Sequence, residues 1–304
     1  MSEEDRSPLI EAGVPADVQG FPGAGAFRFR VGLRPVAEVD WLQPDEQRTE
    51  QLREKQRLAE TAHHEVVAHL PGSEVPSAEV LDAVLAHLDA AGLIERSGSV
   101  VVDVASSITI DLDEVHPIEA AGRLTQEDLC VMEPGDGGHV LTAGSLSFPN
   151  RWRLRDKLGL AMAGIHGPVP RYASDVGEAT DRVLATLRPG RILGRLNWSV
   201  SDDPTLFQQR DRFVGRVDPD DVGGTTWIRT ERQTLRGLSG GAVVFGIRTR
   251  VRSLTELATW PAACAEIADT LREVPDDVAE YKSFGRNSTA VISWLDAAAG
   301  RVTG

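Results

Sequence analysis

The chain has 304 residues, of which 41% are hydrophobic and 26% are charged, and its formal net charge at pH 7 is −14. This composition is typical of a soluble globular protein with enough apolar residues for one large domain or two average ones. The excess of acidic residues disfavours nucleic acid as a partner, because phosphate backbones repel a negative surface. No run approaches the ~18 apolar residues of a membrane span, and the acidic N-terminus lacks an apolar signal segment. We therefore expect a cytoplasmic protein without membrane contact.

In the first half of the chain, the pattern predicts helices followed by short strands. Residues 1–25 are rich in Gly, Pro, Glu and Asp and lack periodicity, which predicts a flexible acidic tail. Helix signals follow, including Val and Leu residues spaced along one face of the second helix. The expected elements are a short strand at 27–33, helices at 44–70 and 76–92, and strands at 100–104 and 108–112.

The second half contains the clearest strand signals. Three runs at 191–200, 225–235 and 242–251 are β-branched or alternating, which predicts an antiparallel meander. Before them, we expect a helical or mixed segment at 117–133, a strand at 139–148, and helices at 154–162 and 174–187. The last fifty residues return to a helical pattern, broken at Pro261. Together these elements predict an α+β fold, with one domain over residues 26–304 and an antiparallel sheet flanked by helices at both ends.

Several common chemical motifs are absent. The sequence has no dinucleotide fingerprint after a strand, no P-loop, no nucleophile elbow and no Cys-x-x-Cys pair, which disfavours Rossmann oxidoreductases, P-loop NTPases and kinases. Cys130 and Cys264 lie 134 positions apart in apolar, helical-looking segments. They form neither a disulfide framework nor a zinc site, so we expect buried structural thiols.

Two histidines stand in unusual surroundings. His116 and His166 each lie in a proline-punctuated segment between apolar stretches. A rigid backbone on both sides fixes the direction of an imidazole, which a metal or haem ligand requires. The alternative is a capping or turn histidine bonded to the backbone. The other five histidines are expected to be solvated, namely His63, His64, His69 and His87 on helices and His139 at a strand start.

Two polar stretches, at 195–199 and 231–235, lie in neighbouring predicted strands. In a meander they could face one another and gather into one patch, in which arginines would suit carboxylates such as haem propionates. The alternative is a solvated sheet face with ion pairs. The residues expected in the patch are Arg195, Asn197, Trp198, Glu231, Arg232 and Gln233.

A series of motifs in fixed order and spacing is recognisable. The sequence resembles the haem-dependent oxidative N-demethylase family over about residues 28 to 283. The motifs are Leu146-Ser147-Phe148-Pro149-Asn150-Arg151-Trp152-Arg153-Leu154, Asp156-Lys157-Leu158-Gly159, Ile165-His166-Gly167-Pro168-Val169-Pro170, Arg188-Pro189-Gly190-Arg191, Arg195-x-Asn197-Trp198-Ser199, Glu231-Arg232-Gln233-Thr234-Leu235 and Gly241-Ala242-Val243-Val244-Phe245-x-Ile247-Arg248-Thr249.

The resemblance implies a PAS-like antiparallel sheet core with helical N- and C-terminal extensions that holds haem b. In the family, the haem iron and dioxygen oxidise an N-methyl group of a small amine such as dimethylamine, and formaldehyde leaves. Electrons come from NADPH through separate flavin and iron–sulfur partners, and some members pass formaldehyde to tetrahydrofolate. This chain has neither a Rossmann fingerprint nor four cysteines, so it would need such a donor.

The resemblance and the residue patterns together give the expected site. His166 is the expected proximal iron ligand, because Gly164 and Gly167 let the backbone approach a flat macrocycle; His116 is the alternative or a distal residue, and Tyr172 is a further candidate. Glu231 either binds a protonated methylamine or pairs with Arg232, and we favour the pair. The expected cofactor-binding residues are His166, His116, Arg195, Asn197, Trp198, Arg232 and Arg248, and the expected catalytic residues are Glu231 and Gln233.

Four departures from the family pattern leave the substrate open, and one of them is the turn Leu238-Ser239-Gly240, which is richer in glycine than usual. Gly167 stands where a small Ala is expected, and Gly246 and Arg250 stand where Thr and an aromatic residue are expected. The competing hypotheses are a haem-binding PAS-like sensor or storage protein without turnover, and a homologue that has lost haem.

Overall fold

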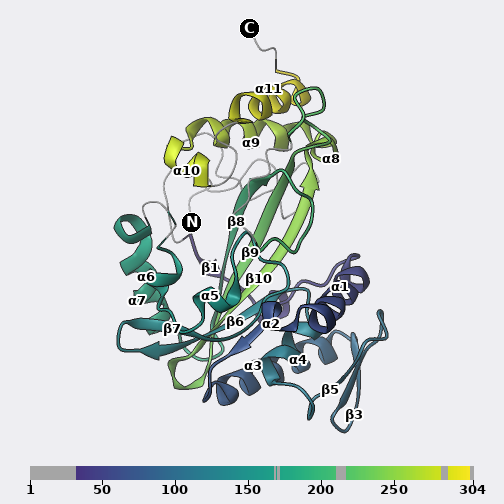
Figure 1. Cartoon of the computed structure of the whole chain (residues 1–304), viewed down its shortest axis with the longest axis vertical. Coiled ribbons are helices and arrows are strands. Elements are labelled where there is room, and N and C mark those ends of the chain that lie inside the picture. The colour runs from purple at the N-terminus through teal and green to yellow at the C-terminus, as the bar shows by residue number, and fades with distance from the viewer. Residues whose placement is uncertain (1–31, 168, 170–171, 210–216, 282–286, 302–304) are drawn as a thin grey trace.

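The computed structural model describes residues 32–167, 169, 172–209, 217–281 and 287–301. The predicted acidic tail and most of the strand predicted at 27–33 lie outside the described residues. Long central strands carry helices at both of their ends and on one side (Figure 1). The predicted α+β class, with a large antiparallel sheet, is therefore confirmed.

Among the described residues, the main sheet has seven strands in the order β1-β8-β9-β10-β6-β7-β2, and every neighbouring pair is antiparallel. Its three longest strands, β8 to β10, are the runs predicted as a meander, so that prediction is confirmed. The strands are β1 (Arg34–Pro35), β2 (Val67–His69), β6 (Asp128–Gly135), β7 (Gly138–Ser145), β8 (Ile192–Ser201), β9 (Trp227–Gly237) and β10 (Val243–Ser253).

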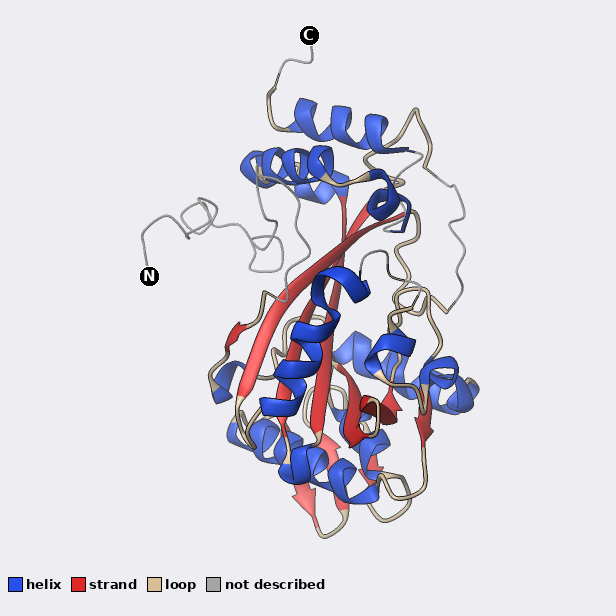
Figure 2. Ribbon diagram, turned by 90° about the vertical axis from the view of Figure 1, so that its left-hand side faces the viewer, coloured by secondary structure: helices blue, strands red, loops and turns tan. Residues whose placement is uncertain are grey.

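Alternation along the strands gives this sheet two different faces. Val131 and Val244 lie in one hydrophobic cluster with helices α3 and α4, whereas Met132 and Phe245 pack in clusters with helices α5 to α7. We call these the α4 face and the α7 face. The helices are α3 (Glu74–Ala90), α4 (Pro117–Leu124), α5 (Leu154–Lys157), α6 (Met162–Ile165) and α7 (Glu178–Thr186). Figure 2, viewed from the left-hand side of Figure 1, shows α7 in front of the long strands.

The N-terminal helices form the largest hydrophobic cluster. Val80, Val84 and Leu88 of α3 are buried in it, which confirms the predicted apolar face of that helix. A small sheet of β3 (Ile94–Ser97), β4 (Val100–Asp103) and β5 (Thr109–Asp111) extends this region at the lower right of Figure 1. Helices α1 (Arg48–Thr61) and α2 (His63–Val66) complete it.

The C-terminal helices cover the far ends of the long strands. Ile267, Val291 and Leu295 are fully buried against Trp198 and other residues of β8 and β9. Burying each such side chain contributes roughly 1.5–3 kcal/mol. The helices are α8 (Leu254–Leu257), α9 (Pro261–Glu273), α10 (Asp276–Tyr281) and α11 (Ser288–Ala298). Because β8 also supplies Ile192 to the N-terminal cluster, one sheet joins the two largest clusters.

Several predicted elements have different limits in the structure. The helix predicted at 44–70 ends early, and its last residues form β2, which pairs with the edge strand β7. The helix predicted at 154–162 is interrupted because Gly159 has a φ of +80°, a conformation that ends a helix. The mixed segment at 117–133 separates into α4 and β6, and β3 was not predicted.

Two smaller expectations also have outcomes. His139 was expected to be solvated, but it is buried and its Nε2 atom lies 2.9 Å from the carbonyl oxygen of Gly241, so that prediction is wrong. Within the described part of the chain, every helix is too short or too polar to cross a lipid bilayer.

Candidate functional site

A row of polar side chains lies on the α7 face where β8 and β9 pair. The register sets Arg195 opposite Gln233 and Asn197 opposite Glu231. The guanidinium Nε of Arg195 donates to Oε1 of Gln233 at 2.8 Å. Four residues that the sequence predicted as one polar patch are therefore brought together, two from each strand.

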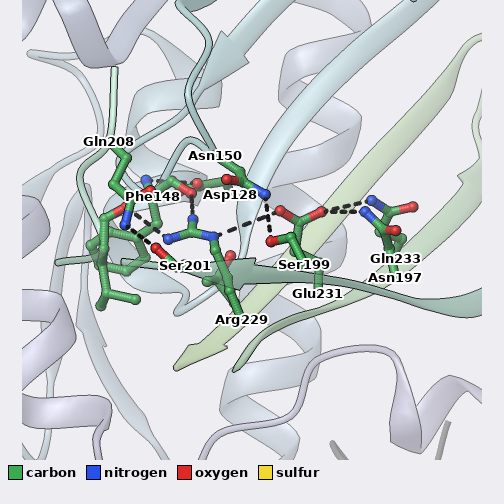
Figure 3. A network of polar contacts seen from close by, with 12 residues as sticks. Asp128, Phe148, Asn150, Asn197, Ser199, Ser201, Gln208, Arg229, Glu231 and Gln233 are labelled. Carbon is green, nitrogen blue, oxygen red and sulfur yellow. Dashed lines mark hydrogen bonds and ion pairs between the residues drawn. The ribbon is translucent and has the colours of Figure 1, made fainter. Parts of the chain in front are cut away.

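Glu231 is the acceptor at the centre of this row, and its carboxylate is only half satisfied (Figure 3). Oε2 accepts hydrogen bonds from Asn197 Nδ2 at 3.2 Å and Gln233 Nε2 at 2.9 Å. Oε1 lies 3.8 Å from Nε of Arg229, beyond hydrogen-bond length, and no described residue donates a hydrogen bond to it. Glu231 is thus held firmly through one oxygen and retains acceptor capacity on the other.

Arg229 lies beside Glu231 and is completely buried. Its Nη2 and Nη1 atoms donate to the carbonyl oxygens of Phe148 at 2.5 Å and Leu206 at 3.3 Å. Burial lowers the pKa of this guanidinium, and the charge of Glu231 opposes that shift. Arg229 therefore fixes the segments that follow β7 and β8 against the strand that carries Glu231 (Figure 3).

A buried ion pair between Lys55 and Asp128 holds the segment after β7 in place. Both oxygens of Asp128 accept backbone N–H groups, from Ser147 and Phe148, each at 2.8 Å. Nζ of Lys55, in α1, lies 3.1 Å from Oδ1 of Asp128, and both side chains are almost fully buried. A helix near the start of the chain thus supports the loop to which Arg229 bonds.

His166 stands at the C-terminal end of α6. Its Nδ1 atom lies 3.0 Å from the carbonyl oxygen of Met162, and its ring stacks on Tyr172 with centroids 4.3 Å apart. Burial lowers the pKa of His166, which favours the neutral ring. A carbonyl acceptor assigns the proton to Nδ1, so Nε2 carries the lone pair. No described residue bonds to Nε2, and metal-ligating histidines are commonly oriented in this way.

The histidine and the polar row belong to the same region. Arg195 is close to both His166 and Tyr172: its charge adds to the burial that lowers the pKa of His166, and it opposes the burial that raises the pKa of Tyr172. Burial lowers the pKa of Arg195 itself, and the charge of Glu231 opposes this. The α7 face therefore combines a neutral imidazole, a desolvated cation and a carboxylate with one open oxygen.

Arg232 and Arg248 are not part of this cluster. Adjacent strand residues point to opposite faces. Both arginines lie on the α4 face, where the register of β9 and β10 sets Arg232 opposite Arg248. Arg232 donates to the backbone oxygens of Asp40 and Trp41, at 2.5 and 3.0 Å. The favoured Glu231–Arg232 pair is therefore wrong, because alternation separates the two side chains and Arg229 is the cation beside Glu231.

The other interactions of Arg248 also keep it on the α4 face. Its Nη2 lies 2.6 Å from Oδ2 of Asp45, and Nη1 donates to Oε1 of Gln51 at 2.9 Å. Trp198 is in neither group, because it is buried in the C-terminal cluster. The single patch expected from the sequence is thus divided among three places.

His116 occupies a helix cap, the alternative that the sequence left open. Its Nδ1 accepts the backbone N–H of Ile118 at 3.3 Å at the start of α4, and Pro117 follows as the first helical residue. The ring stacks on His69 with centroids 3.9 Å apart. Ile118 packs in the N-terminal cluster, whereas Ile165, beside His166, packs on the α7 face.

The two cysteines are the remaining candidates for metal or haem ligation that the sequence offers. Cys130 and Cys264 are buried and free, and burial raises their pKa values to about 12 and about 11. They are therefore structural thiols, and neither is a thiolate at neutral pH. Among the described residues, no three His, Cys, Asp or Glu side chains converge as a metal cluster.

Sequence reasoning missed Arg229 and the Lys55–Asp128 pair. The signal for Arg229 was present, because Arg229, Glu231 and Gln233 follow the two-residue period of one strand face. Lys55 gave no local signal, since its partner is far along the chain.

A comparison with known proteins identifies the family of this chain. A family model described as "Haem-dependent oxidative N-demethylase, alpha subunit-like" matches residues 32–292. The matched region includes all strands of both sheets, α4 to α7 and every residue of the polar row. The chain belongs to the haem-dependent oxidative N-demethylase, alpha subunit-like family.

Proposed function

We propose that this protein is the haem-binding catalytic subunit of an oxidative N-demethylase that acts on a small secondary or tertiary amine, such as dimethylamine. The observation that carries the proposal is the shared α7 face: a neutral histidine with an open Nε2 and a carboxylate with an open Oε1. The family name points to haem and to oxidative demethylation. We further propose that the cofactor is haem b, that the substrate is a small amine, and that the reaction uses dioxygen and releases formaldehyde.

A PAS-like core is part of the same proposal. Numbered along the chain, strands β6 to β10 have the spatial order 2-1-5-4-3, which is the order of a PAS sheet. Helices α5 to α7 lie between the second and third of these strands and cover one face. We infer a single haem-binding domain over residues 26–304, with the cofactor between these helices and the sheet.

The residues of this face suit haem. His166 would supply the axial nitrogen, and Met162, Ile165 and Phe245 would contact the apolar ring. The desolvated guanidinium of Arg195 would pair with a propionate, because a buried charge is costly unless an opposite charge approaches it. When bound, haem supplies the iron at which dioxygen is activated.

Glu231 is the residue that we assign to the amine. A protonated secondary amine donates N–H groups, and Oε1 would accept one in a charge-assisted hydrogen bond. Asn197 and Gln233 hold the carboxylate while this occurs. An N-methyl group, dioxygen, two electrons and two protons yield an N-hydroxymethyl group and water. Loss of the hydroxyl proton and protonation of nitrogen then release formaldehyde, and in this proposal Glu231 would move that proton.

The two electrons must come from outside this chain in the proposed reaction. The description of the family as alpha subunit-like indicates that its members work with other subunits. We propose a separate NADPH-linked flavin and iron–sulfur donor in the cytoplasm. A tetrahydrofolate-dependent acceptor for formaldehyde stays a prediction from the family resemblance.

A spectrum and a product assay test the proposal. The purified protein is loaded with haem b and then given dimethylamine, oxygen and reducing equivalents. We expect a Soret band and formaldehyde. A stable ferrous–CO complex without product would identify a sensor or storage protein, and failure to form a Soret band would identify a homologue that has lost haem.

A further inference from the structure

A rigid turn between α7 and β8 presents two arginines at the surface. Arg191 N–H donates to the carbonyl oxygen of Arg188 at 3.0 Å, and Gly190, between them, has a φ of +73°. Proline at the second position and a left-handed glycine at the third define a type II turn. Its first and fourth residues therefore lie within about 7 Å of each other at Cα.

The sheet holds this turn in place. Gly190 N–H donates to the carbonyl oxygen of Gly237 at 2.9 Å, and Gly237 N–H donates to that of Arg191 at 3.0 Å. A Cβ atom on Gly237 would lie 2.2 Å from the oxygen of Arg188, so only glycine permits this approach. The two arginines are thus fixed by backbone contacts rather than by their own side chains.

These arginines differ from their neighbours in charge balance. Arg182 pairs with Glu178 at 2.7 Å, and Arg236 pairs with Glu38 at 2.5 Å. Arg188 and Arg191 form no ion pair with any described residue. In a chain with a net charge of −14, this turn is a local positive site.

A depression of about 350 Å³ adjoins the turn, and Arg188 and Arg191 are among its lining residues. It is lined by Val183, Leu187 and Leu193, among others. Two of these, Leu187 and Leu193, belong to the same hydrophobic cluster as Met162, and Met162 also belongs to the cluster that includes Ile165, beside His166. The depression therefore borders a hydrophobic cluster that extends to α6, the helix that ends at the expected iron ligand.

We propose that this surface, comprising Arg188, Arg191 and the adjoining depression, is where an acidic electron-transfer protein docks. The inference rests on the proposed function, which needs two electrons from a partner. An apolar centre with arginines beside it is typical of protein interfaces. Both arginines are exposed, so a small anion would gain little from them. A broad acidic surface gains more, because complementary charge also speeds the encounter.

The test compares two double variants that change charge equally. R188E/R191E alters the turn, and R53E/R96E alters two exposed arginines on α1 and β3. The probe is reduced plant-type [2Fe–2S] ferredoxin, an acidic one-electron donor, and the readout is the rate of haem reduction in the loaded full-length protein. We expect R188E/R191E to lower this rate at least roughly tenfold at low salt and to remove its salt dependence. R53E/R96E should stay within about twofold, and reduction by dithionite should be unchanged in both.

Equal rates in the two variants, equal losses in both, or no reduction of the wild-type protein by ferredoxin would overturn the docking proposal. Failure of the proposed function looks different. A protein that releases no formaldehyde still reports docking through its reduction rates. If haem does not bind, the same variants are compared by calorimetric titration with ferredoxin, where loss of binding in R188E/R191E alone supports the proposal and any other result overturns it.

Discussion

The two faces of the main sheet carry equally polar side chains and use them differently. On the α4 face, the Nη atoms of Arg232 and Arg248 donate to carbonyls and side chains of the 40–51 segment, whereas Nε of Arg248 has no partner among the described residues. On the α7 face, His166 and Glu231 each keep one acceptor atom without a described donor. Polar side chains alone therefore do not mark a site in this sheet. On the α7 face the open atoms are a carboxylate oxygen and an imidazole nitrogen, and both belong to side chains that other hydrogen bonds hold in place.

The largest expected effect is loss of haem when the α7 face loses its histidine. We expect His166→Ala to abolish or strongly reduce the Soret band while the circular dichroism spectrum stays near native, because His166 lies outside the buried apolar core. His116→Ala is the control. It removes a helix cap, at a cost of about 1 kcal/mol, and should retain the Soret band. A full Soret band in His166→Ala and none in His116→Ala would instead identify His116 as the iron ligand.

A second prediction compares neighbouring residues on opposite faces. Glu231→Gln keeps the shape of the side chain but removes the charge that would bind an ammonium group. We expect kcat/KM for the amine to fall roughly 10- to 100-fold, the range for a hydrogen bond to a charged group. Arg232→Gln should leave kcat/KM within about twofold. Haem content and thermal melting of both variants establish that the folded holoprotein is being compared, and similar losses in both would remove the distinction between the faces.

The third prediction concerns stability on the α4 face. Arg248→Met removes a fully buried guanidinium and leaves Asp45 and Gln51 without one donor each. We expect a loss of about 2 kcal/mol in the free energy of unfolding, less than for a wholly buried pair because Asp45 is partly exposed and also bonds Arg250. Arg182→Met, at an exposed pair, should cost under about 0.5 kcal/mol. Urea unfolding of the apoprotein measures both, and the Soret band of the holoprotein should be unchanged.

The smallest effect is a pH dependence at Asp45. Burial opposes ionisation of this carboxyl, but the Gln126 amide and the charges of Arg248 and Arg250 outweigh it and lower its pKa. The unfolded chain therefore binds this proton more readily, so the contribution is present above the ordinary aspartate pKa of about 4 and is lost as pH falls below it. Asp45→Asn should flatten the decline in stability between about pH 5 and pH 3. An unchanged slope in urea titrations would contradict this assignment.

Much of the fold could be predicted because its signals are local. The meander follows from alternation, and Val80, Val84 and Leu88 follow from helical spacing. The strand β2 could not be predicted, since residues 67–69 become a strand only by pairing with β7. The polar row of the site could be predicted, but the face on which Arg232 lies could not be read from a polar stretch alone. Grouping 231–235 as one polar stretch ignored the two-residue period that sends Arg232 away from Glu231 and Gln233.

The buried position of Lys55 has a consequence for chemical labelling. The chain has only three lysines, Lys55, Lys157 and Lys282, and the side chain of Lys55 is 1% exposed. An amine-reactive reagent can reach its Nζ only in molecules whose α1 has separated from Asp128 and from the backbone oxygens of Gly122 and Glu127. The rate at which Lys55 becomes modified, measured by mass spectrometry, therefore reports how often α1 separates from Asp128, the residue that holds the loop bonded by Arg229.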